Sequence, residues 1–265
     1  YTEDYFKSIE FVKELDCLLA ISQNTRDDVI KELCIPEDRV QVISSGINER
    51  FLNVKKEDTI SSYIQNRYED YFLFAGGIDF KKNIENLIRA FAKLSSSTRK
   101  NTKLVIAGKA SPDTIQHYKE IARQCHISRN VICTGFVSDE ELMGLYCGAT
   151  ALVFPSLYEG FGLPVIEAMA CGTPVITSNT SSLKEIAEGY GLLVDPESTS
   201  ELTDAMQYVL TNPDELQAMT QRAISHAHEF TWERVAQRTL LAINSIEKRK
   251  SASAPVSGTY YVADD

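Results

Sequence analysis

The stretch FPSLYEGFGLPVIE, residues 154–167, places a glycine-rich turn between an apolar run and an apolar segment that contains a carboxylate. The run that leads into it, residues 149–154, shows no polar–apolar alternation and stops at a proline, which is typical of a buried parallel strand. Pro164 suits the first turn of a helix, because an N–H at that position has no intrahelical acceptor to lose. The stretch therefore predicts a strand, a glycine loop and a helix N-terminus, in that order.

This geometry favours an oxygen-rich ligand, because backbone N–H groups and the positive end of the helix dipole point into the loop. Two carboxylates bracket the loop, Glu159 and Glu167, with seven residues between them. We predict that Glu167 lies in the first turn of the helix. A carboxylate accepts paired hydrogen bonds from vicinal hydroxyls, so the two glutamates suit a ribose and a hexose. In the alternative reading, Glu167 only stabilises the helix dipole and Glu159 is a solvated loop residue.

The longer string EGFGLPVIEAMACGTPVI, residues 159–176, resembles the signature of the retaining GT-B glycosyltransferases of family four, also called glycosyl transferases group 1. The paired glutamates of that family hold a nucleotide-sugar donor. The resemblance implies an α/β fold, in which a Rossmann-like parallel sheet carries helices on both faces, as in the GT-B C-terminal domain. It also implies transfer of a hexose with retention of anomeric configuration. The nucleotide-diphosphate sugar is then a co-substrate, and neither a cofactor nor a metal is expected.

Composition sets limits on the function. The chain has 265 residues, of which 43% are hydrophobic and 24% charged, as in ordinary globular proteins. A net charge of -10 argues against nucleic acid as a partner. We find neither an apolar run of transmembrane length nor a signal peptide. Cys17, Cys133 and Cys171 have apolar neighbours, so we expect buried thiols in a reducing compartment. We therefore expect a cytoplasmic protein, with at most peripheral contact with the cytoplasmic membrane face.

Short apolar runs alternate with amphipathic helices along the rest of the chain, which is the pattern of a parallel sheet covered on both faces. Strands are predicted at residues 71–75, 103–107, 130–134, 149–154, 174–178 and 191–194. Helices are predicted at residues 82–96, 112–126, 138–147, 164–171, 181–188, 198–211, 213–229 and 231–247, with Thr231 as the N-cap of the last.

The two ends of the chain differ from this pattern. A strand, a helix and a strand are predicted at residues 18–22, 25–33 and 40–43, and they resemble the end of the family's N-terminal, acceptor-side domain. We therefore expect four parts. Residues 1–47 are the tail of that domain with the linker, and residues 48–230 are the donor-binding domain. Residues 231–250 form a C-terminal helix, and residues 251–265 form a flexible tail or linker. A complete enzyme needs a further upstream domain of roughly 100–200 residues, so we expect this chain alone to transfer sugar poorly.

The resemblance assigns roles to individual residues. Lys82 matches the lysine of the family motif G-R-x-x-x-x-K, which clasps the diphosphate, although a solvated surface lysine is the alternative. The arginine position of the motif holds Gly77, and replacement of its charge by Lys81 or by backbone N–H groups is open. Glu159 is expected to be the catalytic residue that holds the hexose, and Glu167 to bind the ribose. The complete expected donor site comprises Gly76, Gly77, Lys82, Gly135, Phe136, Val137, Glu159, Gly160, Phe161, Gly162, Leu163 and Glu167.

Within this set, the amides of Phe161, Gly162 and Leu163 are expected to meet phosphate and sugar oxygens. Residues 135–137 are expected to border the nucleobase, unless they form a plain strand-to-helix turn. The expected partners are a GDP- or UDP-linked sugar and a glycan or lipid-linked acceptor.

The string SNTSSLKEIAE, residues 178–188, resembles the mannosyl-transferring branch of the family, which implies mannose as the hexose. Within this string we expect Ser181 or Ser182 to cap the next helix and not to contact the donor. Two other functions stay open. One is another enzyme on a similar scaffold, such as a sugar-nucleotide epimerase or an α-glucan phosphorylase. The other is a non-catalytic nucleotide-sugar binding module.

Overall fold

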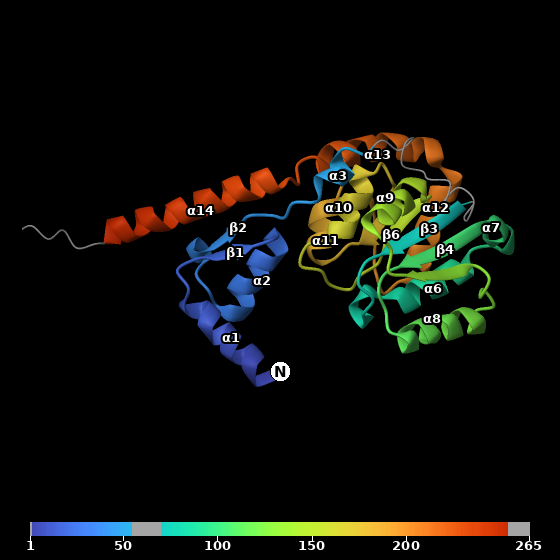
Figure 1. The fold of residues 1–265 in the computed structure, drawn as a ribbon, viewed down its shortest axis with the longest axis horizontal. Coiled ribbons are helices and arrows are strands. Elements are labelled where there is room, and N and C mark those ends of the chain that lie inside the picture. Colours follow the sequence, from blue (N-terminus) through green and yellow to red (C-terminus); the bar gives the residue numbers. More distant parts are fainter. Residues whose placement is uncertain (1, 55–69, 254–265) are drawn as a thin grey trace, which may run out of the picture.

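The computed structural model describes residues 2–54 and 70–253 of the chain (Figure 1). Its main body is built on a six-stranded sheet with the strand order β5-β4-β3-β6-β7-β8, in which all neighbouring strands run parallel. The strands are β3 (Asp70–Ala75), β4 (Thr102–Ala107), β5 (Val131–Gly135), β6 (Ala151–Phe154), β7 (Val175–Ser178) and β8 (Leu192–Val194). All six predicted strands are confirmed, with bounds that differ by at most two residues.

The central strands are buried on both faces, which explains why they read as continuous apolar runs. Residues 71–75 of β3 are at most 1% exposed, and every residue of β6 is buried. The rings of Phe74 in β3 and Phe154 in β6 stack with centroids 5.5 Å apart. The carboxyl ends of β3 and β6 are therefore held side by side by core packing.

Helices cover both faces of the sheet (Figure 1). On one face lie α6 (Ile84–Lys93), α8 (Pro112–Gln124) and α12 (Thr199–Thr211). On the other lie α9 (Asp139–Gly148), α10 (Leu163–Ala170) and α11 (Ser181–Ala187), with α13 (Pro213–Ala227) packed against α10. From β3 the chain proceeds outward through β4 to β5, and from β6 it proceeds outward in the opposite direction. The switch point between β3 and β6 is where open α/β sheets bind ligands, beyond the carboxyl ends of the strands.

Two helix predictions need correction at this edge. The helix predicted from residue 82 begins at Ile84, because Asn83 is left-handed (φ 58°) and ends a separate 3-10 turn, η2 (Phe80–Lys82). Helix α10 begins at Leu163, after Gly162 with φ 117°, and carries no acidic residue in its first turn. The prediction that Glu167 lies in the first turn is therefore wrong, because Glu167 is the fifth residue of the helix.

Four described elements were absent from the sequence-based prediction besides η2. Helix α7 (Ser96–Asn101) is separated from α6 because Leu94 leaves the helical conformation (ψ 151°) and Ser95 caps the new helix through the Thr98 N–H. The others are α1 (Thr2–Glu14), α3 (Glu49–Leu52) and the 3-10 turn η1 (Glu37–Arg39).

The N-terminal unit has the predicted strand–helix–strand order, with β1 (Leu18–Ala20) parallel to β2 (Val40–Val42) and α2 (Gln23–Leu33) between them. The long helix α14 (Trp232–Ser253) extends from the main body toward the same side as this unit (Figure 1). The predicted cap of α14 is confirmed, since Thr231 Oγ1 accepts the Arg234 N–H at 3.3 Å. Because α14 reaches Ser253, the first three residues of the predicted tail are helical, and the others lie outside the described residues.

The chain crosses between the two units at two adjacent points. The Ile47 N–H donates to the Phe230 carbonyl at 3.0 Å. At Gly46, a Cβ atom would lie 2.7 Å from the Trp232 nitrogen, so only glycine fits there without a shift. The linker segment and the start of α14 therefore pack directly against each other.

The thiol predictions are confirmed only in part: Cys171 is buried, whereas Cys17 and Cys133 are partly exposed. None of the helices in the described part of the chain is both long and apolar enough to cross a membrane.

Candidate functional site

The loops that follow β3 and β6 are joined by hydrogen bonds at the switch point. The Lys81 carbonyl accepts the Leu157 N–H at 2.8 Å and the Ser156 hydroxyl at 3.0 Å. The Asn83 side-chain amide donates to the Pro155 carbonyl at 3.1 Å. These bonds fix the glycine loop of residues 155–162 against the turn that carries Lys82.

Lys82 and Glu159 form an ion pair inside this junction. Lys82 Nζ donates to Glu159 Oε1, and the two side chains are only 16% and 15% exposed. Lys82 Nζ also lies 5.5 Å from the centroid of the Phe154 ring. The residue expected to hold the diphosphate and the residue expected to hold the hexose are thus in direct contact, although 77 positions separate them in the sequence. Without ligand, each group neutralises the charge of the other.

The start of α10 presents backbone donors to the same loop. Among the described residues, the N–H groups of Phe161, Gly162 and Leu163 have no hydrogen-bond acceptor. Phe161 is buried against Phe230, with ring centroids 5.7 Å apart. At Gly162, a Cβ atom would lie 2.6 Å from a methyl carbon of Leu183, and φ is positive. Packing therefore holds these donors in place, and a helix N-terminus of this kind suits an anionic oxygen.

Glu167 lies one turn further along α10. Its Oε2 atom accepts a 3.0 Å hydrogen bond from the hydroxyl of Tyr146, which α9 supplies and which is fully buried. Burial raises the pKa of the Glu167 carboxyl, and the Tyr146 hydrogen bond opposes that rise. Burial also raises the pKa of Tyr146 well above its usual value, so the phenol remains a donor. Tyr146 fixes one oxygen of Glu167, and the second oxygen can accept hydrogen bonds from a ligand.

Two serines of α11 brace the glycine loop. Ser181 Oγ accepts the Glu159 N–H at 3.1 Å, and Ser182 Oγ lies 2.7 Å from the Phe161 carbonyl and 2.9 Å from that of Glu159. The prediction that Ser181 or Ser182 caps α11 is wrong, because the N-cap is Thr180, which makes no side-chain cap bond. The first turn of α11 lies against the loop, so the hydroxyls of the serines bind loop backbone groups instead.

The glycine pair after β3 is open on one side. Gly76 has φ 142°, and a Cβ atom there would lie 3.7 Å from the ring of Pro164 at the start of α10. A Cβ atom at Gly77 would have no heavy atom within 4 Å, and its φ is not in the left-handed region. The backbone does not require glycine at position 77, and space for a longer side chain exists there.

The predicted residues 135–137 lie at the end of β5, which is two strands away from β3 in the sheet. Gly135 is the last residue of β5 and has φ 76°, and its carbonyl accepts the Gly108 N–H at 3.0 Å. Phe136 is 80% exposed, whereas Val137 packs against the core. The turn lies at the same carboxyl edge as Lys82 and Glu159, with β4 between it and the strand that leads to Lys82, and β4 and β3 between it and the strand that leads to Glu159.

Sequence reasoning missed Tyr146 as a partner of Glu167 and misjudged the two serines. Tyr146 lies in the apolar second half of α9, with no charged group beside it in the sequence, and so carries no signal of such a role. The contacts arise from the packing of α9 and α11 around α10, which local patterns do not encode.

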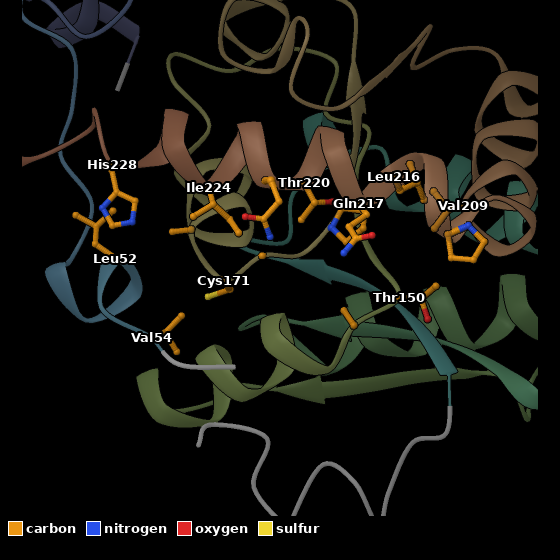
Figure 2. A pocket seen from close by; sticks show the side chains of 16 residues that line it. Leu52, Val54, Thr150, Cys171, Val209, Leu216, Gln217, Thr220, Ile224 and His228 are labelled. Carbon is orange, nitrogen blue, oxygen red and sulfur yellow. The ribbon is translucent and has the colours of Figure 1, made fainter. Parts of the chain in front are cut away.

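A cavity of about 560 Å³ lies at the opposite end of α10 (Figure 2). It is lined by Thr150 at the amino end of β6, by Cys171 just beyond α10, and by side chains of α13 such as Gln217 and Ile224. None of the sixteen described residues that line it is a lysine or an arginine. This cavity opens at the edge opposite to Lys82 and Glu159, and its described lining offers neither a lysine nor an arginine to a phosphate.

Comparison with known proteins identifies the family. The chain matches Glycosyl transferases group 1 over residues 55–226. It is 30% identical over 260 residues to the serotype-specific mannosyltransferase WbdA of Escherichia coli. The aligned region covers 97% of this chain and 32% of WbdA. It is 29% identical over 227 residues to the O-antigen chain mannosyltransferase B of Escherichia coli. This aligned region covers 85% of this chain and 59% of that protein. The chain therefore spans less than two thirds of the length of these relatives.

Among solved structures, Anabaena Alr3699/HepE in complex with UDP and glucose has a TM-score of 0.81 and 18% identity, covering 92% of this chain and 68% of that one. This likeness confirms the predicted fold class, the Rossmann-like α/β architecture of GT-B. The family match includes Lys82, Glu159 and Glu167 and extends over more than half of the 265 residues. The chain thus belongs to the glycosyl transferases group 1 family.

Proposed function

We propose that this chain is the donor-binding half of a retaining glycosyltransferase. The enzyme moves a hexose from a nucleotide-diphosphate sugar to a glycan or lipid-linked acceptor. One observation carries the proposal: Lys82, Glu159 and the N–H groups of residues 161–163 converge at the switch point of the sheet. A cation and oriented amides suit a diphosphate, and a carboxylate beside them suits the hydroxyls of the attached sugar.

In this proposal the donor replaces the contact between Lys82 and Glu159. The diphosphate takes Lys82 and the α10 amides, and hexose hydroxyls take Glu159. The ribose binds Glu167, whose orientation Tyr146 maintains. The nucleobase extends along the carboxyl edge of the sheet toward residues 135–137.

Chemistry then consists of breaking the bond between the anomeric carbon and the diphosphate oxygen and forming a bond to the acceptor oxygen on the same face, while the proton of the acceptor hydroxyl passes to the departing diphosphate. The protein contributes by positioning the donor and by stabilising charge on the leaving diphosphate. Lys82 and the α10 amides lie where that charge develops, and we propose that no metal is needed. The brace from Ser181 and Ser182 keeps Glu159 and the amides in fixed relation to each other.

We propose mannose as the transferred hexose. The support is similarity to WbdA and to mannosyltransferase B, both of which are named for mannose transfer. We propose guanine or uracil as the base, and the similar Anabaena structure, which holds UDP and glucose, supports uracil.

Calorimetric titration with GDP, UDP and ADP, followed by GDP-mannose and UDP-glucose, tests this function. We expect GDP or UDP and the matching sugar derivative to bind more tightly than ADP, with turnover below about 1 per second for the isolated chain. Absence of binding by every nucleotide would contradict the proposal. Sugar transfer at ordinary enzyme rates would contradict the proposal that this chain is the donor-binding half.

A further inference from the structure

Helix α2 of the N-terminal unit is held at its start by a residue of the main body. Glu185 of α11 accepts the Gln23 N–H at 3.1 Å through Oε1 and the Asn24 N–H at 3.2 Å through Oε2. These are the first two N–H groups of α2, which have no intrahelical acceptor. One carboxylate therefore satisfies two donors of a helix that belongs to the other unit.

The same helix also contacts the glycine loop on both sides of Glu159. The hydroxyl of Tyr158 donates to Asp28 Oδ2, and this bond raises the pKa of Tyr158 to about 12. Thr25 Oγ1 donates to the Gly160 carbonyl at 3.2 Å. The two loop residues adjacent to Glu159 are thus bonded to α2.

Helix α11 connects these two sets of contacts. Ser181 and Glu185 are four positions apart, so they lie on one face of the helix. Ser181 holds the Glu159 N–H, and Glu185 holds the start of α2. A displacement of α2 would therefore act on the Glu159 backbone by two routes, through α11 and through the direct contacts of Tyr158 and Gly160.

We propose that Glu185 is a positioning residue, which sets the conformation of the loop around Glu159 by fixing α2 against α11. The loop conformation is then determined jointly by the N-terminal unit and the main body. That this conformation serves a nucleotide sugar rests on the proposed function. The mechanical coupling of α2 to the loop does not rest on it.

Amide hydrogen exchange on Glu185→Ala tests the coupling without any ligand. We expect faster exchange at Gln23 and Asn24 and at Glu159, whose N–H is bonded to Ser181, with unchanged exchange in the core strands β3 and β4. Glu188→Ala is the matched control, because it removes an equal charge at the exposed C-terminal end of the same helix. Glu185→Gln retains one carbonyl-type acceptor and should give intermediate exchange. Faster exchange at α2 alone, or a uniform rise that includes the core strands, would overturn the proposal.

A second measurement is the affinity for GDP and UDP. We expect Glu185→Ala to weaken the nucleotide that binds the wild type by about fivefold, the lower end of usual coupling between sites. Glu188→Ala should bind like the wild type. Unchanged affinity in Glu185→Ala would overturn the coupling to the donor site. If the wild type binds neither nucleotide, the proposed function fails, and the exchange experiment still decides whether Glu185 positions the loop.

Discussion

Replacing Lys82 by alanine is the perturbation that best tests the charge arrangement of the donor site. Lys82 and Glu159 are paired and only 16% and 15% exposed, so a diphosphate has to take the lysine from the glutamate. Removing Lys82 deletes the cation that meets the phosphates. It also leaves the Glu159 carboxylate without its partner, and that negative charge then repels the incoming diphosphate.

The expected loss has two parts. A hydrogen bond to a charged group contributes about 1.5–3 kcal/mol, which corresponds to roughly a tenfold to hundredfold weaker diphosphate affinity. The repulsion from Glu159 adds to this loss, and it disappears when Glu159 is neutral. Lys82→Ala combined with Glu159→Gln should therefore bind plain diphosphate more tightly than Lys82→Ala alone. Glu159→Gln by itself should tighten the binding of plain diphosphate, because Lys82 then has no carboxylate partner to leave, while it reduces discrimination in favour of the intact nucleotide sugar.

Isothermal titration of the wild type and the three variants with a nucleoside and its diphosphate measures these effects. Nucleoside affinity should barely change, and the diphosphate loss should shrink as salt rises, because the Debye length falls from about 10 Å at 0.1 M to about 3 Å at 1 M. A stable Lys82→Ala protein with normal diphosphate affinity would show that the anion binds elsewhere. A double variant that binds diphosphate no more tightly than Lys82→Ala alone would refute the repulsion from Glu159.

Three further variants follow from the structure. Glu167→Gln should raise the melting temperature at neutral pH and weaken nucleotide binding. Because burial raises the pKa of the Glu167 carboxyl above 4.5, ionisation of this group destabilises the folded protein above the folded-state pKa. Thermal melts should therefore show that the gain in melting temperature vanishes below pH 4.5. Gly77→Arg should tighten diphosphate binding by calorimetry without lowering the melting temperature, since the site is open and φ is not left-handed; a large drop in melting temperature would refute this. Gly46→Ala should lower the free energy of unfolding, measured by urea denaturation, by about 1–3 kcal/mol, because the added methyl group clashes with Trp232. An unchanged free energy of unfolding would contradict the packing of the linker on α14.

The sheet and the location of the site could be predicted because their signals are local. Parallel strands buried on both faces have no alternation, so β3 and β6 were recognisable as continuous apolar runs. The glycine loop with Pro164 marks a helix start by composition alone. The meeting of Lys82 with Glu159 follows once both loops are placed at one sheet edge.

The details of the site depend on tertiary contacts that no local pattern contains. Tyr146 reaches Glu167 only because α9 packs beside α10. Ser181 and Ser182 have the composition of helix caps, yet the loop lies close enough to bind both hydroxyls. Asn83 is left-handed and separates Lys82 from α6, a backbone choice that asparagine allows but does not dictate.

Amide NMR titration of the wild-type chain with GDP and UDP is the decisive test of the donor site, because it maps the bound nucleotide onto the fold. We predict the largest shifts at the amides of Phe161, Gly162 and Leu163, with further shifts at Lys82 and near Glu167. Residues around the opposite cavity, such as Cys171 and Gln217, should be unaffected (Figure 2). Shifts confined to that cavity, or none at residues 161–163 while a nucleotide binds, would contradict the assignment of the donor site.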